Sequence, residues 1–166
     1  LDGLKISEDG RKAAYLDTDA NTGETVLIEQ ELGKEKAETI AAKVQSFGYV
    51  GNTLIYYFDY AEGVGSLGVA GSKTTIAKAS GVQYAEDAVY YIAEADEKTG
   101  NGELRAWDGK TETPIAKDAF VFQYKNNGKL VYIGSYDVNT GLGDLYYYNG
   151  KEARKLDSGI TAIFIY

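Results

Sequence analysis

The sequence predicts an all-β fold built from four repeated units, and three observations support this prediction. A twelve-residue segment occurs four times, and each copy has Asp at its first place, Gly at its fifth and Leu at its ninth. The copies occupy residues 19–30, 59–70, 96–107 and 137–148. The chain has 15 tyrosines and 20 glycines but a single proline. A period near 40 residues, with short apolar runs between turn signals, is typical of repeats made of small antiparallel sheets.

Four short strands are expected in each unit, because aromatic and β-branched runs alternate with glycine-containing turns. In the first unit, Asp9-Gly10 predicts a two-residue hairpin turn, since glycine adopts positive φ without steric cost. Residues 31–43 also have a helical composition, but the same place in the other units is strand-like, so a strand is preferred. The strands expected in the first two units are 4–7, 12–16, 26–30, 39–44, 46–50, 53–58, 66–69 and 74–78.

The third and fourth units repeat this order, with Asn127-Gly128 among their predicted turns. A last strand, 161–166, begins a fifth unit and is apolar on both faces, so it is expected to pair with residues 4–7 or with another copy of the chain. We expect one repeat domain over residues 1–166, with units at about 1–44, 45–79, 80–118 and 119–159. The remaining strands are 82–85, 88–93, 103–107, 114–117, 120–124, 129–134, 144–148 and 153–156.

Four strands per unit with turns every 8 to 12 residues are typical of β-propeller blades. The hairpins Asp-Gly-Arg at 9–11 and Asn-Gly-Lys at 127–129 resemble those of the TolB-like class of β-propeller repeats, found in bacterial cell-envelope proteins. The resemblance implies blade-like units, an interaction role and a location outside the cytoplasm. A compact four-unit array is favoured, and a piece of a larger propeller is the alternative. The tyrosines at the strand centres are assigned to Tyr15, Tyr57, Tyr91 and Tyr132.

The amino-acid composition of the chain argues against several classes of function. A net charge of −8 argues against nucleic acid and anionic membrane surfaces as partners, and no apolar run approaches the length of a membrane span. The absence of His and Cys excludes a Ser-His-Asp triad, a cysteine nucleophile and the usual Zn²⁺ sites. A carboxylate pair stays open among 25 acidic residues. Because those acids fall mainly in turns and on solvent-facing places, we expect no enzyme, no catalytic residue and no cofactor.

One loop has the composition of a cation site. Asp17, Asp19 and Asn21 alternate before Gly23, as oxygen ligands of Ca²⁺ do. The glycine is one place late for an EF-hand loop, and no Glu stands at the twelfth place. Each Asp that opens a repeat segment can instead accept hydrogen bonds from backbone N–H groups further along its turn. This second interpretation is preferred, so no metal ligand is predicted. The chain begins at Leu1 and has no Met, so we expect it to be processed or cut from a longer protein.

The tyrosine run in the fourth unit has two faces. Alternation places Leu145 and Tyr147 on one face and Tyr146 and Tyr148 on the other. Core packing between units is the preferred role, and an aromatic binding surface, including Trp107, is the alternative. Two functional hypotheses follow. The first is a non-catalytic module outside the cytoplasm that binds protein, or itself through edge strands. The alternative is a module that binds cell-wall glycan on Tyr and Trp side chains.

Overall fold

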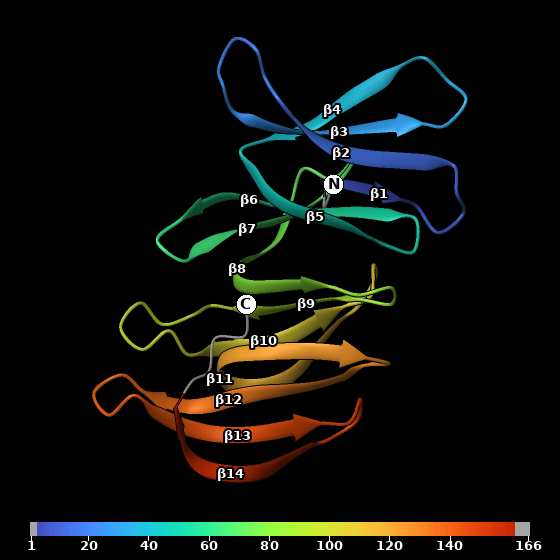
Figure 1. The fold of residues 1–166 in the computed structure, drawn as a ribbon. Helices are drawn as coiled ribbons and strands as arrows, with labels where there is room; N and C mark the ends of the chain where they lie inside the picture. The colour runs from blue at the N-terminus through green and yellow to red at the C-terminus, as the bar shows by residue number, and fades with distance from the viewer. Residues whose placement is uncertain (1–2, 162–166) are drawn as a thin grey trace. The chain divides into compact units, whose positions relative to one another are not determined.

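The predicted all-β class is confirmed by a computed structural model, which describes residues 3–161. This range contains fourteen strands and no helix, so it has no helix that could cross a membrane. Segment 31–43, for which a helix was the rejected alternative, contains the strand β4 (Ala37–Ala42). The other strands (Figure 1) are β1 (Leu4–Ile6), β2 (Lys12–Thr18), β3 (Thr25–Glu31), β5 (Val44–Val50), β6 (Thr53–Ala61), β7 (Val64–Val69), β8 (Thr75–Tyr84), β9 (Val89–Ala93), β10 (Gly102–Trp107), β11 (Glu112–Asn126), β12 (Lys129–Asp137), β13 (Leu142–Tyr148) and β14 (Ala153–Thr161).

The strands are ordered as a four-stranded sheet, β1-β2-β3-β4, and a ten-stranded sheet that runs in sequence order from β14 to β5. This differs from the expected separate four-stranded units. Strands predicted at 74–78 and 82–85 are one strand, β8, and those at 114–117 and 120–124 are one strand, β11. Strand pairing continues through both predicted boundaries, although Gly81 inside β8 has a positive φ of 61°. The positive φ of Lys43, 55°, does separate β4 from β5.

One further expectation changes near the start of the described range, and another lies almost wholly beyond its end. The Asp9-Gly10 turn is longer than two residues, because the Ser7 N–H donates to the Lys12 carbonyl and the loop between them holds four residues. The Ser7 hydroxyl sets this length, since it accepts the Lys12 N–H and donates to the Asp9 carboxylate. The strand predicted at 161–166 is described only at Thr161, which ends β14. Residues 162–166, and their predicted pairing, lie outside the described residues.

The chain divides into two compact units. Unit 1 comprises Leu1–Lys78 and Tyr84–Ala88, and unit 2 comprises Ala79–Gln83 and Val89–Tyr166. The core of unit 1 joins the first repeat to the second. It contains Ala14, Leu27, Val44, Phe47 and Leu54, all at most 5% exposed.

Cross-strand pairing in both units confirms the register of the repeat. The ninth-place leucines pair as Leu16↔Leu27, Tyr57↔Leu67, Ile92↔Leu104 and Ile133↔Leu145. The residues at the tenth place of the repeat pair with a tyrosine each time, as Tyr15↔Ile28, Tyr56↔Gly68, Tyr91↔Arg105 and Tyr132↔Tyr146. Tyr57 lies at the centre of β6, as predicted, but the residue of the second unit that is equivalent in register to Tyr15, Tyr91 and Tyr132 is Tyr56. A Tyr-Tyr doublet hides this in the sequence, because either residue can be taken as the strand centre.

Candidate binding site

The ninth-place leucine is covered in three repeats and only partly covered in the fourth. Leu27, Leu67 and Leu104 are each 0% exposed, whereas Leu145 is half-buried. All four leucines occupy the same place in the same antiparallel pairing, so the difference lies in what covers them. The pleat places Val121, Gln123, Val131 and Ile133 on the same side as Leu145. These five residues are called the Leu145 face.

The other repeats show what covers such a face. In the first repeat, Leu27 lies in one cluster with Val44, Phe47 and Leu54, which belong to the first two strands of the next repeat. In the third repeat, the ring of Tyr90 stacks on Tyr124 of β11 with centroids 4.8 Å apart. Each of these faces therefore packs against the strand that opens the following repeat.

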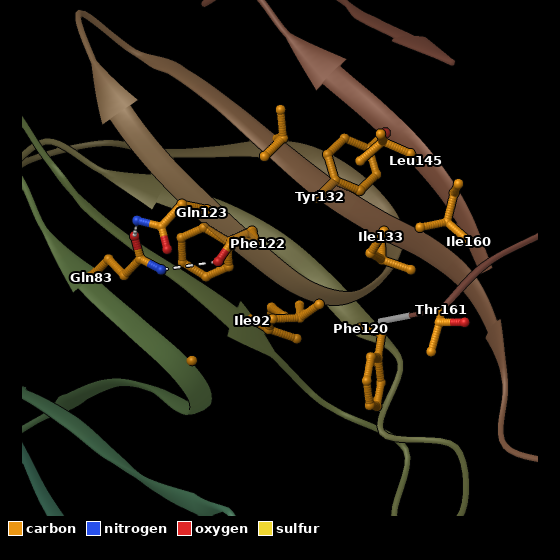
Figure 2. Close-up of a pocket in the computed structure, with 13 residues that line it drawn as sticks. Gln83, Ile92, Phe120, Phe122, Gln123, Tyr132, Ile133, Leu145, Ile160 and Thr161 are labelled. Carbon is orange, nitrogen blue, oxygen red and sulfur yellow. Dashed lines mark hydrogen bonds between the residues drawn. The ribbon is translucent and has the colours of Figure 1, made fainter. Parts of the chain in front are cut away.

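A cavity of about 350 Å³ extends along the fourth repeat and includes the Leu145 face (Figure 2). Its lining is mainly apolar, and none of its lining residues is charged. Tyr132 is 6% exposed, and burial, followed by the neighbouring Tyr146, raises the pKa of its phenol. The lining residues are Gly81, Gln83, Ile92, Phe120, Val121, Phe122, Gln123, Val131, Tyr132, Ile133, Leu145, Ile160 and Thr161.

Two glutamines supply most of the polar groups of this cavity. Gln83 Nε2 donates to the Phe122 carbonyl at 2.9 Å, and Gln83 Oε1 accepts the Tyr124 N–H at 2.9 Å. Figure 2 shows Gln83 and Gln123 side by side, with a weak bond of 3.5 Å between Gln123 Nε2 and Gln83 Oε1. Consecutive residues of β11, from Phe120 to Gln123, line the cavity, and since successive side chains point to opposite faces, the cavity follows an edge of that strand.

The predicted loop sites are backbone-capped turns in three of the four repeats. Asp19 Oδ1 accepts the N–H groups of Asn21 and Thr22, at 2.8 and 2.9 Å. The Asp96 loop has the same pattern, and the Asp137 carboxylate accepts the Asn139 N–H. In the three loops, these hydrogen bonds are the largest cause that lowers the pKa of the aspartate.

The loop residues suggested as calcium ligands do not meet as a set. Asp17 Oδ1 accepts the Thr18 N–H, while Asp19 accepts bonds within its own turn. Groups of three or more acidic residues placed to hold a metal ion are not found within residues 3–161. The Asp59 copy also departs from the expected loop. Asp59 lies inside β6, and the chain reverses at Glu62 and Gly63, which have φ of 51° and 89°.

The aromatic run follows the predicted alternation. Tyr146 pairs with Tyr132 and stacks on it at 4.8 Å with an interplanar angle of 6°. Tyr147 pairs with Val131 on the opposite side, beside the Leu145 face. The stacked pair accords with the core-packing interpretation, because Tyr132 is buried.

Sequence reasoning missed the glutamines and one ionic cluster. The recurrence of Gln-Tyr at 83–84 and 123–124 was the available signal for the glutamines. The ionic cluster centres on Arg105, which bonds Glu103 and, at 3.1 Å, Glu112. Tyr91 donates its hydroxyl proton to Glu112. Burial opposes the charge of Arg105, but the two carboxylates outweigh it and raise the pKa of the guanidinium.

Comparison with solved structures places this fold among β-propellers. The chain is similar to the β-propeller domain of the Trilobed protease from Pyrococcus furiosus, with a TM-score of 0.53, 14% identity, and coverage of 92% of this chain and 56% of that one. It is also similar to the N-terminal domain of Nup159, with a TM-score of 0.51, 11% identity, and coverage of 94% and 43%. TolB from Acinetobacter baumannii matches with a TM-score of 0.49, 11% identity, and coverage of 95% and 43%.

The first two matches confirm the resemblance to β-propeller proteins, and at such identities they show the fold alone. The chain spans between 30% and 56% of the length of the first structures that it matches. No protein-family model matches the sequence, and no curated protein matches it either.

Proposed function

We propose that this chain is a non-catalytic interaction module that binds a protein partner through the cavity on the Leu145 face. The observation that supports it is the contrast among the four leucines: three are 0% exposed, and Leu145 is half-buried beside a cavity of about 350 Å³. An apolar surface that equivalent repeats cover with another strand is suited to contact with a second protein.

The proposal includes blade-like units and a location outside the cytoplasm. Positive φ angles at Lys43, Gly81 and Gly159 fall close to three of the expected unit boundaries. The matched β-propeller domain of the Pyrococcus furiosus protease supports the blade-like arrangement. The resemblance to TolB-like repeats supports an extracytoplasmic location, which is tested by whether added protease digests the protein in intact cells.

Binding is favoured over catalysis by the acidic residues that do cluster. Glu103 and Glu112 are both bonded to one guanidinium, that of Arg105. A carboxylate pair for acid-base chemistry needs one member that can hold a proton near neutral pH, whereas both members of this pair are bonded to a guanidinium.

Glycan binding is the second candidate, because Trp107 and the run from Tyr146 to Tyr148 are partly exposed. Such rings can stack on sugars. One of them already stacks on Tyr132, which leaves it at most one free face. A panel of cell-wall polysaccharides tests this candidate through the fluorescence of Trp107.

The experiment that tests the protein-binding proposal uses a photo-crosslinking amino acid in place of Leu145. A matched control has the same amino acid in place of Leu156, which is 48% exposed and belongs to β14. In cells that express the native protein, one partner protein should crosslink at position 145 and not at position 156. Identical crosslinking at both positions, or saturable polysaccharide binding that persists in Leu145→Asp, would contradict the proposal.

A further inference from the structure

We infer that the cavity binds an extended apolar strand of the partner protein, and that Gln123 holds the backbone of this strand through a donor and an acceptor bond. The inference rests on the proposed function, because it names the kind of segment that the partner presents. Two places within the chain show how a strand of this kind is held.

The first is Gln83, which binds the backbone of β11 with both ends of its amide. Nε2 donates to the Phe122 carbonyl and Oε1 accepts the Tyr124 N–H, each at 2.9 Å. These backbone groups are two residues apart, as are the groups that an extended strand presents on one edge. A primary amide has a donor and an acceptor side by side, so it can replace the edge of a neighbouring strand.

Gln123 occupies the same place one repeat later. Val82-Gln83-Tyr84 and Phe122-Gln123-Tyr124 lie 40 residues apart, and both triplets lie in strands that open a repeat. Gln123 is exposed, and its Nε2 bonds the Tyr124 carbonyl at 3.1 Å and, weakly, Gln83 at 3.5 Å. Its Oε1 accepts no hydrogen bond from residues 3–161. The acceptor of this amide is therefore free within the described residues, and Nε2 can exchange its weak bond to Gln83 for a bond to a new strand, as Gln83 does for β11.

The second place is the first repeat, where an extended strand covers the equivalent leucine. Leu27 packs with Val44 and Phe47, which both belong to β5 (Val44–Val50). A strand that covered Leu145 in the same way would present apolar side chains to it. The lining of the cavity contains no charged residue, so the segment that it accommodates is neutral as well as apolar.

The binding experiment uses a fluorescent peptide with the sequence of β5, VQSFGYV, and the chain of residues 1–166. Fluorescence anisotropy should show saturable binding, whereas a scrambled peptide of the same composition should not bind. Gln123→Ala should weaken binding about tenfold, since it removes two backbone hydrogen bonds. Gln123→Glu, which keeps an acceptor but sets a carboxylate oxygen against the peptide carbonyl, should weaken it at least as much. The matched control is Gln45→Ala, an exposed glutamine of β5 in unit 1, and it should leave binding unchanged.

If Gln123 binds the peptide backbone, binding should also depend on the backbone N–H groups of the peptide. Methylating the peptide nitrogens one at a time should abolish binding at one position and spare it at its neighbours, because alternate N–H groups point to opposite edges of a strand. Equal affinity for Gln123→Ala and the native chain overturns the inference, as does equal affinity for every methylated peptide. If a partner still crosslinks at position 145 after such a result, the proposed function stands, and only the inference that the partner presents an extended strand is rejected.

One competitor can be tested with the same peptide. The residues after Thr161 are apolar, and the variant Phe164→Asp changes that character within the full chain. Peptide binding by this variant and none by the native chain would assign the cavity to the chain's own end and overturn the inference of a partner strand. Equal binding by both chains supports the inference. Binding by neither chain overturns it.

Discussion

The third and fourth repeats share one strand pairing and differ in how they are covered. All five residues of β9, from Val89 to Ala93, are buried, and Leu104 beside them is 0% exposed. Leu145 has the same place in the fourth repeat, but it is half-buried and lines a cavity. The repeat sequence thus determines register and face, while the neighbouring segment determines whether that face becomes core or accessible surface.

The residues that pair with the tenth place of the repeat show the same division. Tyr91 and Tyr132 are equivalent, and both are at most 6% exposed. Tyr91 pairs with Arg105 and donates to Glu112, whereas Tyr132 pairs with Tyr146 and stacks on it. One residue type at one place therefore supports an ionic cluster in one repeat and an aromatic pair in the next.

The largest expected effect is a difference in the free energy of unfolding between substitutions of Leu104 and Leu145. Leu104→Ala should cost about 2–5 kcal/mol in the free energy of unfolding, because it leaves a cavity in a closed core. Leu145→Ala should cost less than about 2 kcal/mol, since the site already adjoins open space. Urea unfolding of both variants measures this difference. Leu67→Ala, another fully buried leucine, should match Leu104→Ala, and equal losses at Leu104 and Leu145 would remove the contrast between the repeats.

Alkaline pH should destabilise the fold through its buried phenols. Burial, and next the bond to Glu112, raises the pKa of Tyr91, and burial raises the pKa of Tyr57 to about 12. The folded chain keeps these protons when the unfolded chain, with pKa values near 10, has released them. Stability is therefore full below about pH 10 and falls as pH rises, by about 1.4 kcal/mol for each unit of pKa difference.

Urea midpoints between pH 8 and 11.5 would measure this loss. Tyr91→Phe should weaken the pH dependence, because Tyr91 is 0% exposed. Flat midpoints across this range would show that the phenols are accessible in the folded chain.

A smaller contrast is expected at two equivalent glycines. A Cβ on Gly102 would lie 2.5 Å from the Ala93 carbonyl oxygen and 2.7 Å from Ile92. A Cβ on Gly143 would lie 2.5 Å from Ile133 but 3.0 Å from the Gly134 carbonyl oxygen. The first clash is with backbone and cannot relax by a side-chain movement. Gly102→Ala should therefore cost about 1–3 kcal/mol, and Gly143→Ala less. Thermal unfolding of both proteins tests the order, which would be reversed if the fourth repeat were the more rigid.

Much of this architecture could be predicted from the sequence, because it depends on local chemistry. Gly23, Gly100 and Gly141 have φ near 70°, and each N–H donates to the carbonyl of the Asp four residues earlier. That loop is encoded within five residues, so its recurrence defined the period. The expected Asp-opened loop is absent at Asp59 for a local reason too. Glu62-Gly63 forms a tight turn there, so β6 continues through Asp59.

The candidate site could not be predicted in the same way. Alternation placed Leu145 and Tyr147 on one face correctly, but it contains no information about which repeat leaves that face open. Gln83 bonds residues 39 and 41 positions away, and such a contact has no periodic signal within one strand. The joined strands β8 and β11 were missed because a strand can continue across a repeat boundary, and in β8 it does so even through Gly81, which has a positive φ of 61°.

The smallest effect on stability is expected at the Asp96 and Asp137 loops, where the third and fourth repeats should respond equally. Asp96→Ala and Asp137→Ala should each lower the melting temperature slightly and equally, since both exposed carboxylates accept backbone N–H groups of their own turn. Those bonds lower the pKa of each carboxyl group. The stabilisation is therefore complete above the unfolded value and disappears as pH falls through the folded one. The native chain and each variant should melt alike at pH 2 and differ at pH 7.

The same turns should not depend on calcium. Each Asp carboxylate already accepts backbone N–H groups of its own turn and needs no ion, so millimolar Ca²⁺ or a chelator should leave these melting temperatures unchanged. A rise of several degrees with Ca²⁺ in the native chain, lost in Asp137→Ala, would show that the loop binds the ion.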